Sequence, residues 1–122
     1  MSDEFLKVAR QEIQSEIDSL KDIFLVCVND EQVSMKSKDI EKHMHKIKGL
    51  APMMGQEKVG EIARISDIIL KHVTNYGILK DSHMLIFDAV QKMSDLFDGR
   101  TNIEVDNFRN KVKETFPDIL VS

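Results

Sequence analysis

The segment from His45 to Gly55 places three residue types that could do chemistry within one helical turn. His45, Lys48 and Gly49 stand at positions i, i+3 and i+4, and residues with this spacing are neighbours on the surface of an α-helix. An imidazole is a nitrogen nucleophile, an ammonium group offsets negative charge, and a glycine leaves space beside both. These are the parts needed to carry a phosphoryl group on an imidazole and pass it to a partner.

The element that must position these residues is a predicted helix over residues 38–54, with Ser37 as its N-cap. At about 100° per residue, His45 lies about 140° from the centre of the apolar stripe, on the solvent side. His43 falls at the edge of the stripe on the other side, so the two histidines cannot bind one metal ion together. Gly49 costs about 1 kcal/mol relative to alanine inside a helix, which suggests that space is needed there. The stripe consists of Ile40, Met44, Ile47, Ala51 and Met54.

The rest of the chain predicts further amphipathic helices and no strand. Apolar residues recur at spacings of three and four, and a polar linker runs from residue 29 to about Ser37. Pro52 must bend the 38–54 helix or end it within a turn of residue 48. The short connections favour an all-α, up-and-down four-helix bundle with an accessory helix, in one domain over residues 1–122. The five predicted helices cover 3–28, 38–54, 56–75, 82–97 (starting at Asp81 or Ser82) and 103–116.

Composition narrows the class of protein. The chain has 122 residues and a net charge of −4, and a mildly acidic chain without a basic stretch argues against nucleic acid as a partner. No apolar run approaches the roughly 20 residues needed to cross a bilayer, and the acidic N-terminus does not read as a signal peptide. The single cysteine, Cys27, permits no internal disulfide and is expected to be buried. A cytoplasmic protein without a membrane partner is therefore predicted.

The string His45-x-Ile47-Lys48-Gly49-x-Ala51-x-x-x-Gly55 resembles the signature of histidine phosphotransfer (HPt) domains. It is most similar to the N-terminal phosphotransfer domains of chemotaxis histidine kinases of the CheA type, with six matching positions over eleven residues. The resemblance extends to helix order and length over nearly the whole chain. It implies a four-helix bundle with an accessory helix, and an exposed histidine that takes phosphate on Nε2.

The resemblance also implies roles for residues beyond His45. Asp67 stands where the family usually has a glutamate that holds the other ring nitrogen, Nδ1; it is either that carboxylate or a solvated helix residue. Arg64 stands where the chemotaxis form often has a histidine, and Pro52 is atypical although Gly55 is kept. Lys48 would offset charge on the phosphoryl oxygens.

The expected partners are a histidine kinase catalytic domain and a receiver domain. The chain contains neither a P-loop nor a Gly-x-Gly-x-x-Gly motif, so ATP and Mg²⁺ are expected to come from the partners and the chain to be a carrier rather than an enzyme. It is either a stand-alone monomer or a fragment of a larger kinase. The partner surface is predicted around His45 from Glu41, Gly49, Pro52 and Arg64, and Met53 or Met54 would add an apolar contact.

Three alternatives compete with this interpretation. A non-catalytic helical interaction module predicts that His45→Gln leaves all activity intact. A carboxylate–histidine metal bundle requires Glu-x-x-His pairs on two helices, and the chain has none, so no bound metal is expected. A nucleic-acid-binding helical domain is disfavoured by the net charge. His72 and His83 have no neighbours at catalytic spacing and are interpreted as structural or surface residues.

Overall fold

The protein is all-helical in the computed structural model, which describes residues 2–119 and 121. No strand occurs among these residues, and none of their helices is long and apolar enough to cross a membrane. Six α-helices are found over the described ranges where the sequence predicted five, because the expected linker contains a short helix. They are α1 (Asp3–Val26), α2 (Asp30–Met35), α3 (Ser37–Leu50), α4 (Glu57–Tyr76), α5 (Ser82–Phe97) and α6 (Val105–Thr115), with a 3₁₀ turn η1 at Pro52–Met54.

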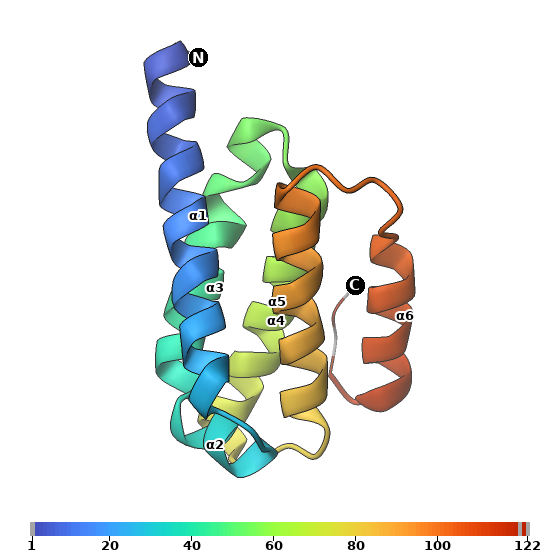
Figure 1. Ribbon diagram of the computed structural model, residues 1–122. Coiled ribbons are helices and arrows are strands. Elements are labelled where there is room, and N and C mark those ends of the chain that lie inside the picture. Colours follow the sequence, from blue (N-terminus) through green and yellow to red (C-terminus); the bar gives the residue numbers. More distant parts are fainter. Residues whose placement is uncertain (1, 120, 122) are drawn as a thin grey trace.

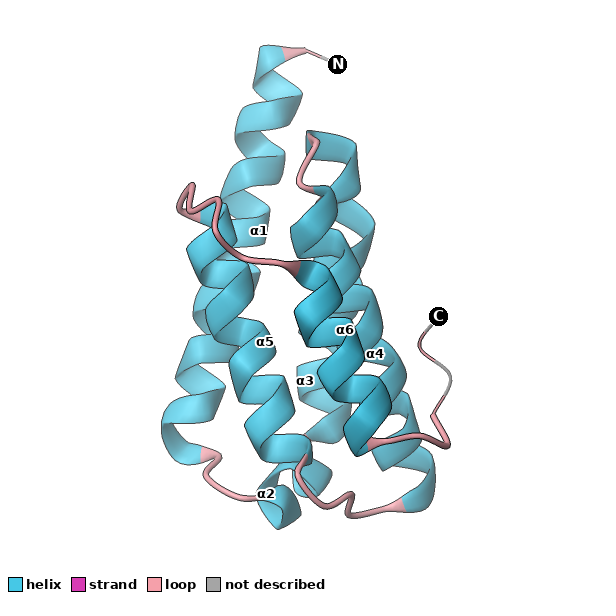
Figure 2. Cartoon of the chain, turned by 90° about the vertical axis from the view of Figure 1, so that its right-hand side faces the viewer, coloured by secondary structure: helices cyan, strands magenta, loops and turns pink. Residues whose placement is uncertain are grey.

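Four long helices enclose the core. Helix α1 packs on α3, α3 on α4, α4 on α5, and α5 on α1, and the colour gradient shows successive long helices running in alternating directions (Figure 1). Helix α6 lies outside this group against α4 (Figure 2). The predicted apolar stripes face inward, as amphipathic helices require. The largest fully buried side chains include Ile13, Ile17, Leu20, Ile40, Met44, Ile47, Ile62, Ile65, Ile69, Leu70, Leu85 and Phe108.

The polar segment after α1 forms α2 because its side chains cap its own backbone. The Asn29 side chain accepts a hydrogen bond from the backbone N–H of Gln32 (2.9 Å), which is a helix N-cap. Val33 is fully buried, and Asp30 accepts hydrogen bonds from the backbone N–H groups of Asp81 (2.9 Å) and His83 (2.8 Å) at the start of α5. The prediction of a linker here was wrong because one buried residue and two carboxylate contacts leave no periodic signal.

Helix α3 begins one residue before the predicted range and, of the two alternatives set by Pro52, ends within a turn of residue 48. Ser37 is the first helical residue and makes no capping hydrogen bond; its buried hydroxyl accepts a hydrogen bond from Thr74 of α4 (2.9 Å). Helix α3 ends at Leu50, and Pro52 starts the η1 turn. A Cβ atom added to Gly60 of α4 would lie 2.8 Å from Pro52 Cγ, so the missing side chain at Gly60 lets the turn after α3 pack closely on α4.

Candidate functional site

His45 lies on the solvent side of α3, where the helical spacing placed it. Its side chain is 60% exposed, while Met44 and Ile47 on the opposite side of the helix are fully buried in the core. Gly49, one turn further on, is exposed, and a Cβ atom added there would meet nothing within 4 Å. Packing within the chain does not require glycine at this position, so its effect is to leave the surface beside the imidazole flat.

Asp67 of α4 is the buried partner of this histidine. The residue is 1% exposed, and its Oδ2 lies 3.6 Å from His45 Nδ1, which is longer than a hydrogen bond. The same oxygen accepts hydrogen bonds from the ammonium groups of Lys48 (2.8 Å) and Lys71 (3.2 Å). Its other oxygen, Oδ1, is buried and has no hydrogen-bond partner among the described residues. Of the two interpretations of Asp67, the solvated helix residue is therefore wrong.

Glu41, one turn before His45 on α3, brings a second carboxylate to the site. Its carboxylate lies 3.8 Å from the Lys71 ammonium. Burial, first of all, and the neighbouring Asp67 carboxylate raise the pKa of Glu41 above its ordinary value. Burial pushes the pKa of Asp67 upward as well, but hydrogen bonds, first among them that from Lys48, outweigh it and lower the pKa. Asp67 is therefore the more acidic member of this carboxylate pair.

The structure does not bring Arg64 into this group. Its guanidinium donates hydrogen bonds to both carboxylate oxygens of Glu61 (2.9 and 2.6 Å) and to the Val121 carbonyl (2.9 Å). Arg109 of α6 donates to the same carboxylate (2.8 Å). Hydrogen bonds from Arg64, together with those from Arg109, outweigh burial and lower the pKa of Glu61 to about 2. Arg64 thus ties the C-terminal segment to α4, and Arg109 ties α6 to α4 through Glu61.

The other predicted partner-binding residues lie near the C-terminal end of α3. Pro52 is exposed and packs on Gly60. Met53 is half-exposed, whereas Met54 is partly buried and packs against the core. An apolar contact with a partner is therefore available to Met53, next to the turn that follows α3.

Lys71 is the site residue that the sequence analysis missed. It stands four residues after Asp67 on α4, and this spacing alone places the two side chains on one helix face. The same rule pairs Glu41 with His45 on α3, which the analysis treated only as a partner contact. Both i, i+4 spacings can be found in the sequence. Such pairs are frequent on helix surfaces, however, so the spacing does not distinguish these two from ordinary surface pairs.

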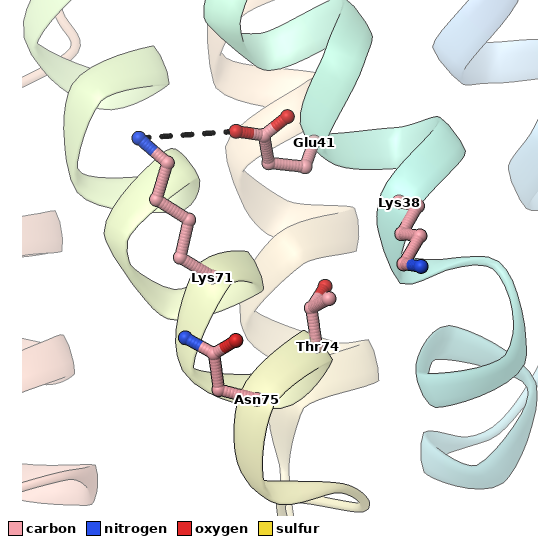
Figure 3. A pocket seen from close by; sticks show the side chains of 5 residues that line it. All are labelled: Lys38, Glu41, Lys71, Thr74 and Asn75. Carbon is pink, nitrogen blue, oxygen red and sulfur yellow. Dashed lines mark ion pairs between the residues drawn. The ribbon is translucent and has the colours of Figure 1, made fainter.

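A pocket of about 240 Å³ opens beside this cluster, along the groove between α3 and α4. Lys71 and Glu41 form an ion pair at one end of it, with Thr74 and Asn75 along α4 and Lys38 on α3 (Figure 3). Because Lys71 and Glu41 also belong to the Asp67 group, the pocket is continuous with the candidate site.

The remaining histidines have structural contacts. His43 Nδ1 donates a hydrogen bond to Glu16 Oε2 of α1 (2.7 Å). His83 Nε2 bonds to the Cys27 carbonyl oxygen (2.8 Å), and its ring stacks on Phe87. The His72 ring packs on Tyr76. Among the four histidines, His45 combines high exposure with a buried carboxylate facing one ring nitrogen.

The chain was compared with protein-family models, with curated protein sequences and with solved structures. No family model, curated protein or solved structure matches it. The geometry around His45 and the sequence motif that contains it are therefore the features that bear on function.

Proposed function

We propose that this chain is a histidine phosphotransfer domain that accepts a phosphoryl group on Nε2 of His45 and passes it to an aspartate of a receiver domain. The observation that carries this proposal is an exposed imidazole whose Nδ1 faces a fully buried, ionised carboxylate. A carboxylate only accepts hydrogen bonds, so it favours the tautomer with the proton on Nδ1. Nε2, on the other side of the ring, then carries the free electron pair.

The transfer needs no proton to leave the ring. As the Nε2–P bond forms, the bond between phosphorus and the donor oxygen breaks, and that oxygen leaves with the donor. Positive charge develops on the imidazole while Nδ1 keeps its proton, and Asp67 stabilises that charge from 3.6 Å away. Transfer to the receiver reverses these steps, with an aspartate oxygen as the attacking group.

Lys48 has a second role in this proposal. Its ammonium is bonded to Asp67 (2.8 Å) and its side chain is partly exposed. Lys71 bonds to the same carboxylate oxygen, so the carboxylate stays compensated when Lys48 turns toward the incoming phosphoryl oxygens. Positioning and charge compensation of this kind supply most of the catalysis in phosphoryl transfer.

The finer architecture belongs to the same proposal. We assign α1, α3, α4 and α5 to an up-and-down four-helix bundle, with α6 as the accessory helix and α2 inside the connection between α1 and α3. Two observations support this assignment: each of the four long helices packs against two of the others, and α6 packs against α4. The bundle closes its own core, which favours a monomer of one domain. A cytoplasmic location is part of the same proposal.

The proposed partners are a histidine kinase catalytic domain, which brings ATP and Mg²⁺, and a receiver domain. Their docking face is the exposed surface of α3 around His45, with Glu41 on one side and Gly49, Pro52 and Met53 on the other. We leave Arg64 out of this face because its guanidinium is bound to Glu61 and to the C-terminal segment.

Phosphorylation of three proteins tests the proposal: wild type, His45→Gln and His43→Gln. The donors are phosphoramidate, a small phosphoryl donor that needs no partner, and a histidine kinase core with ATP and Mg²⁺. We expect an acid-labile, base-stable phosphoryl group on wild type and His43→Gln and none on His45→Gln. Labelling of His45→Gln to the wild-type level, or no labelling of wild type by phosphoramidate, would contradict the proposal. The second result would favour a non-catalytic interaction module.

A further inference from the structure

We propose that Glu41, His45 and Asp67 form a binding site for a divalent transition-metal ion of the zinc type. Each residue offers one ligand atom, and these three atoms lie within 4.8 Å of one another. Glu41 and His45 are one turn apart on α3, and Asp67 reaches them from α4. The site thus joins two ligands at i, i+4 spacing with a third from the neighbouring helix.

The distances fit a shared ion better than a direct hydrogen bond. His45 Nδ1 and Asp67 Oδ2 are 3.6 Å apart, and two ligands bound tetrahedrally to one zinc ion are about 3.4 Å apart. The widest separation in the cluster, up to 4.8 Å, must shorten by up to about 1.4 Å. The Glu41 side chain is partly exposed, so it has room to move toward the ion.

An independent observation also points to a ligand here. Asp67 is 1% exposed, and its Oδ1 has no hydrogen-bond partner among the residues described. Leaving a buried carboxylate oxygen unpaired is costly. An ion bound between the two helices would satisfy this oxygen.

The ligand types select the class of metal. One imidazole and two carboxylates suit zinc and its first-row neighbours, whereas Mg²⁺ and Ca²⁺ prefer sites made of oxygen alone. The exposed side of His45 leaves room for water at the remaining coordination positions. Three protein ligands with an open position are typical of accessible zinc sites.

Two ammonium groups compete with the metal ion for the Asp67 carboxylate. Lys48 and Lys71 both bond to Asp67 Oδ2, and each side chain is partly exposed, so each ammonium can move into water when the ion binds. Removing one of them should therefore strengthen metal binding. A histidine that binds zinc alone on the surface would not respond in this way.

Metal on Nδ1 would also change the chemistry of His45. The neutral ring then carries its proton on Nε2, so Nε2 has no free electron pair. If the proposed phosphotransfer function is correct, zinc would block phosphorylation. This consequence depends on that function, whereas the metal site itself does not.

Zinc titration of the isolated chain by calorimetry, without kinase or nucleotide, tests the site. We expect wild type to bind one zinc ion and His45→Gln, Glu41→Gln and Asp67→Asn each to weaken binding by at least about tenfold. Lys48→Met should bind more tightly. His43→Gln is the matched control, because His43 also faces a buried carboxylate, and it should bind like wild type.

Three results would overturn the proposal. They are no binding to wild type up to about 1 mM zinc, unchanged affinity in both carboxylate variants, and an equal loss in His43→Gln. Circular dichroism checks that each variant folds. If Asp67→Asn does not fold, Glu41→Gln and the zinc-induced shift of the His45 Nδ1 resonance in nitrogen NMR decide the matter. Phosphorylation measured in zinc-free buffer remains a separate test, so either proposal can fail alone.

Discussion

Helix α3 carries two histidines, His43 and His45, that face buried carboxylates of different helices. His43 is 14% exposed and donates a 2.7 Å hydrogen bond to Glu16 of α1, whose side chain is 6% exposed. His45 is 60% exposed and lies 3.6 Å from Asp67 of α4, whose side chain is 2% exposed. In the first pair the carboxylate is buried and the imidazole is largely covered, whereas in the second only the carboxylate is buried.

The two pairs differ in how far the imidazole is accessible from solvent. The His43 ring is enclosed and its hydrogen bond is already optimal, so it holds α1 against α3. The His45 ring has one edge toward a fixed charge and most of its surface toward solvent, where a partner can reach it. Burial of the carboxylate is common to both pairs, and exposure of the imidazole separates them.

The largest difference is expected in stability. His43→Leu leaves Glu16 buried with only Lys46 beside it (3.1 Å), and loss of a hydrogen bond to a buried charge should lower the free energy of unfolding by about 2 kcal/mol. His45→Leu removes no buried contact and should change it by less than about 0.5 kcal/mol. Urea unfolding at pH 7 measures both. Equal losses would show that the two pairs are energetically alike.

Chemical reactivity should separate the two rings less strongly. Diethyl pyrocarbonate should modify His45 at least about tenfold faster than His43, because a buried ring must wait for local opening of the structure. Tandem mass spectrometry of the peptide that contains both residues gives the two rates. Modification of both at one rate would mean that α3 opens readily and that the exposure difference has no chemical consequence.

The smallest effect is expected in the pH dependence of the free energy of unfolding at acid pH. Burial pushes the pKa of Glu16 upward, but hydrogen bonds from His43 and Lys46 outweigh it, and the folded-state pKa lies below the ordinary value of 4.5. Its stabilisation is therefore full above about pH 4.5 and is lost as the pH falls through the folded-state pKa. Unfolding free energies of Glu16→Gln should accordingly depend less on pH below 4.5 than those of wild type. If the free energy of unfolding of Glu16→Gln depended on pH as strongly as that of wild type, another group would be responsible for the acid dependence.

The helices that carry most of the core could be predicted from the sequence. Apolar residues at three- and four-residue spacing locate α1, α3, α4, α5 and α6, and the angle between His45 and the stripe of α3 places the imidazole outside. Pro52 indicated that this helix bends near residue 48 or ends within a turn of it, and α3 ends at Leu50. The short helix α2 was missed because its stability comes from a cap and from contacts with α5.

The site was predictable only in part. The motif located His45, Lys48 and Gly49, but it did not show that Lys48 is bonded to Asp67, that Lys71 shares the same oxygen, or that Arg64 is held by Glu61. The Lys48–Asp67 contact joins residues 19 positions apart on different helices. Spacing within one helix carries no information about such a contact.

The helical periodicity, the face of α3 on which His45 lies and the interruption of that helix by Pro52 follow from the sequence alone, because each depends on residues within a few turns. The tertiary structure alone decided which carboxylate faces which histidine and how deeply each is buried. Those properties depend on how α1 and α4 pack against opposite sides of α3, since interhelical packing sets the distances between side chains and the water around them. The same packing makes His43 a structural residue and leaves His45 open to a partner.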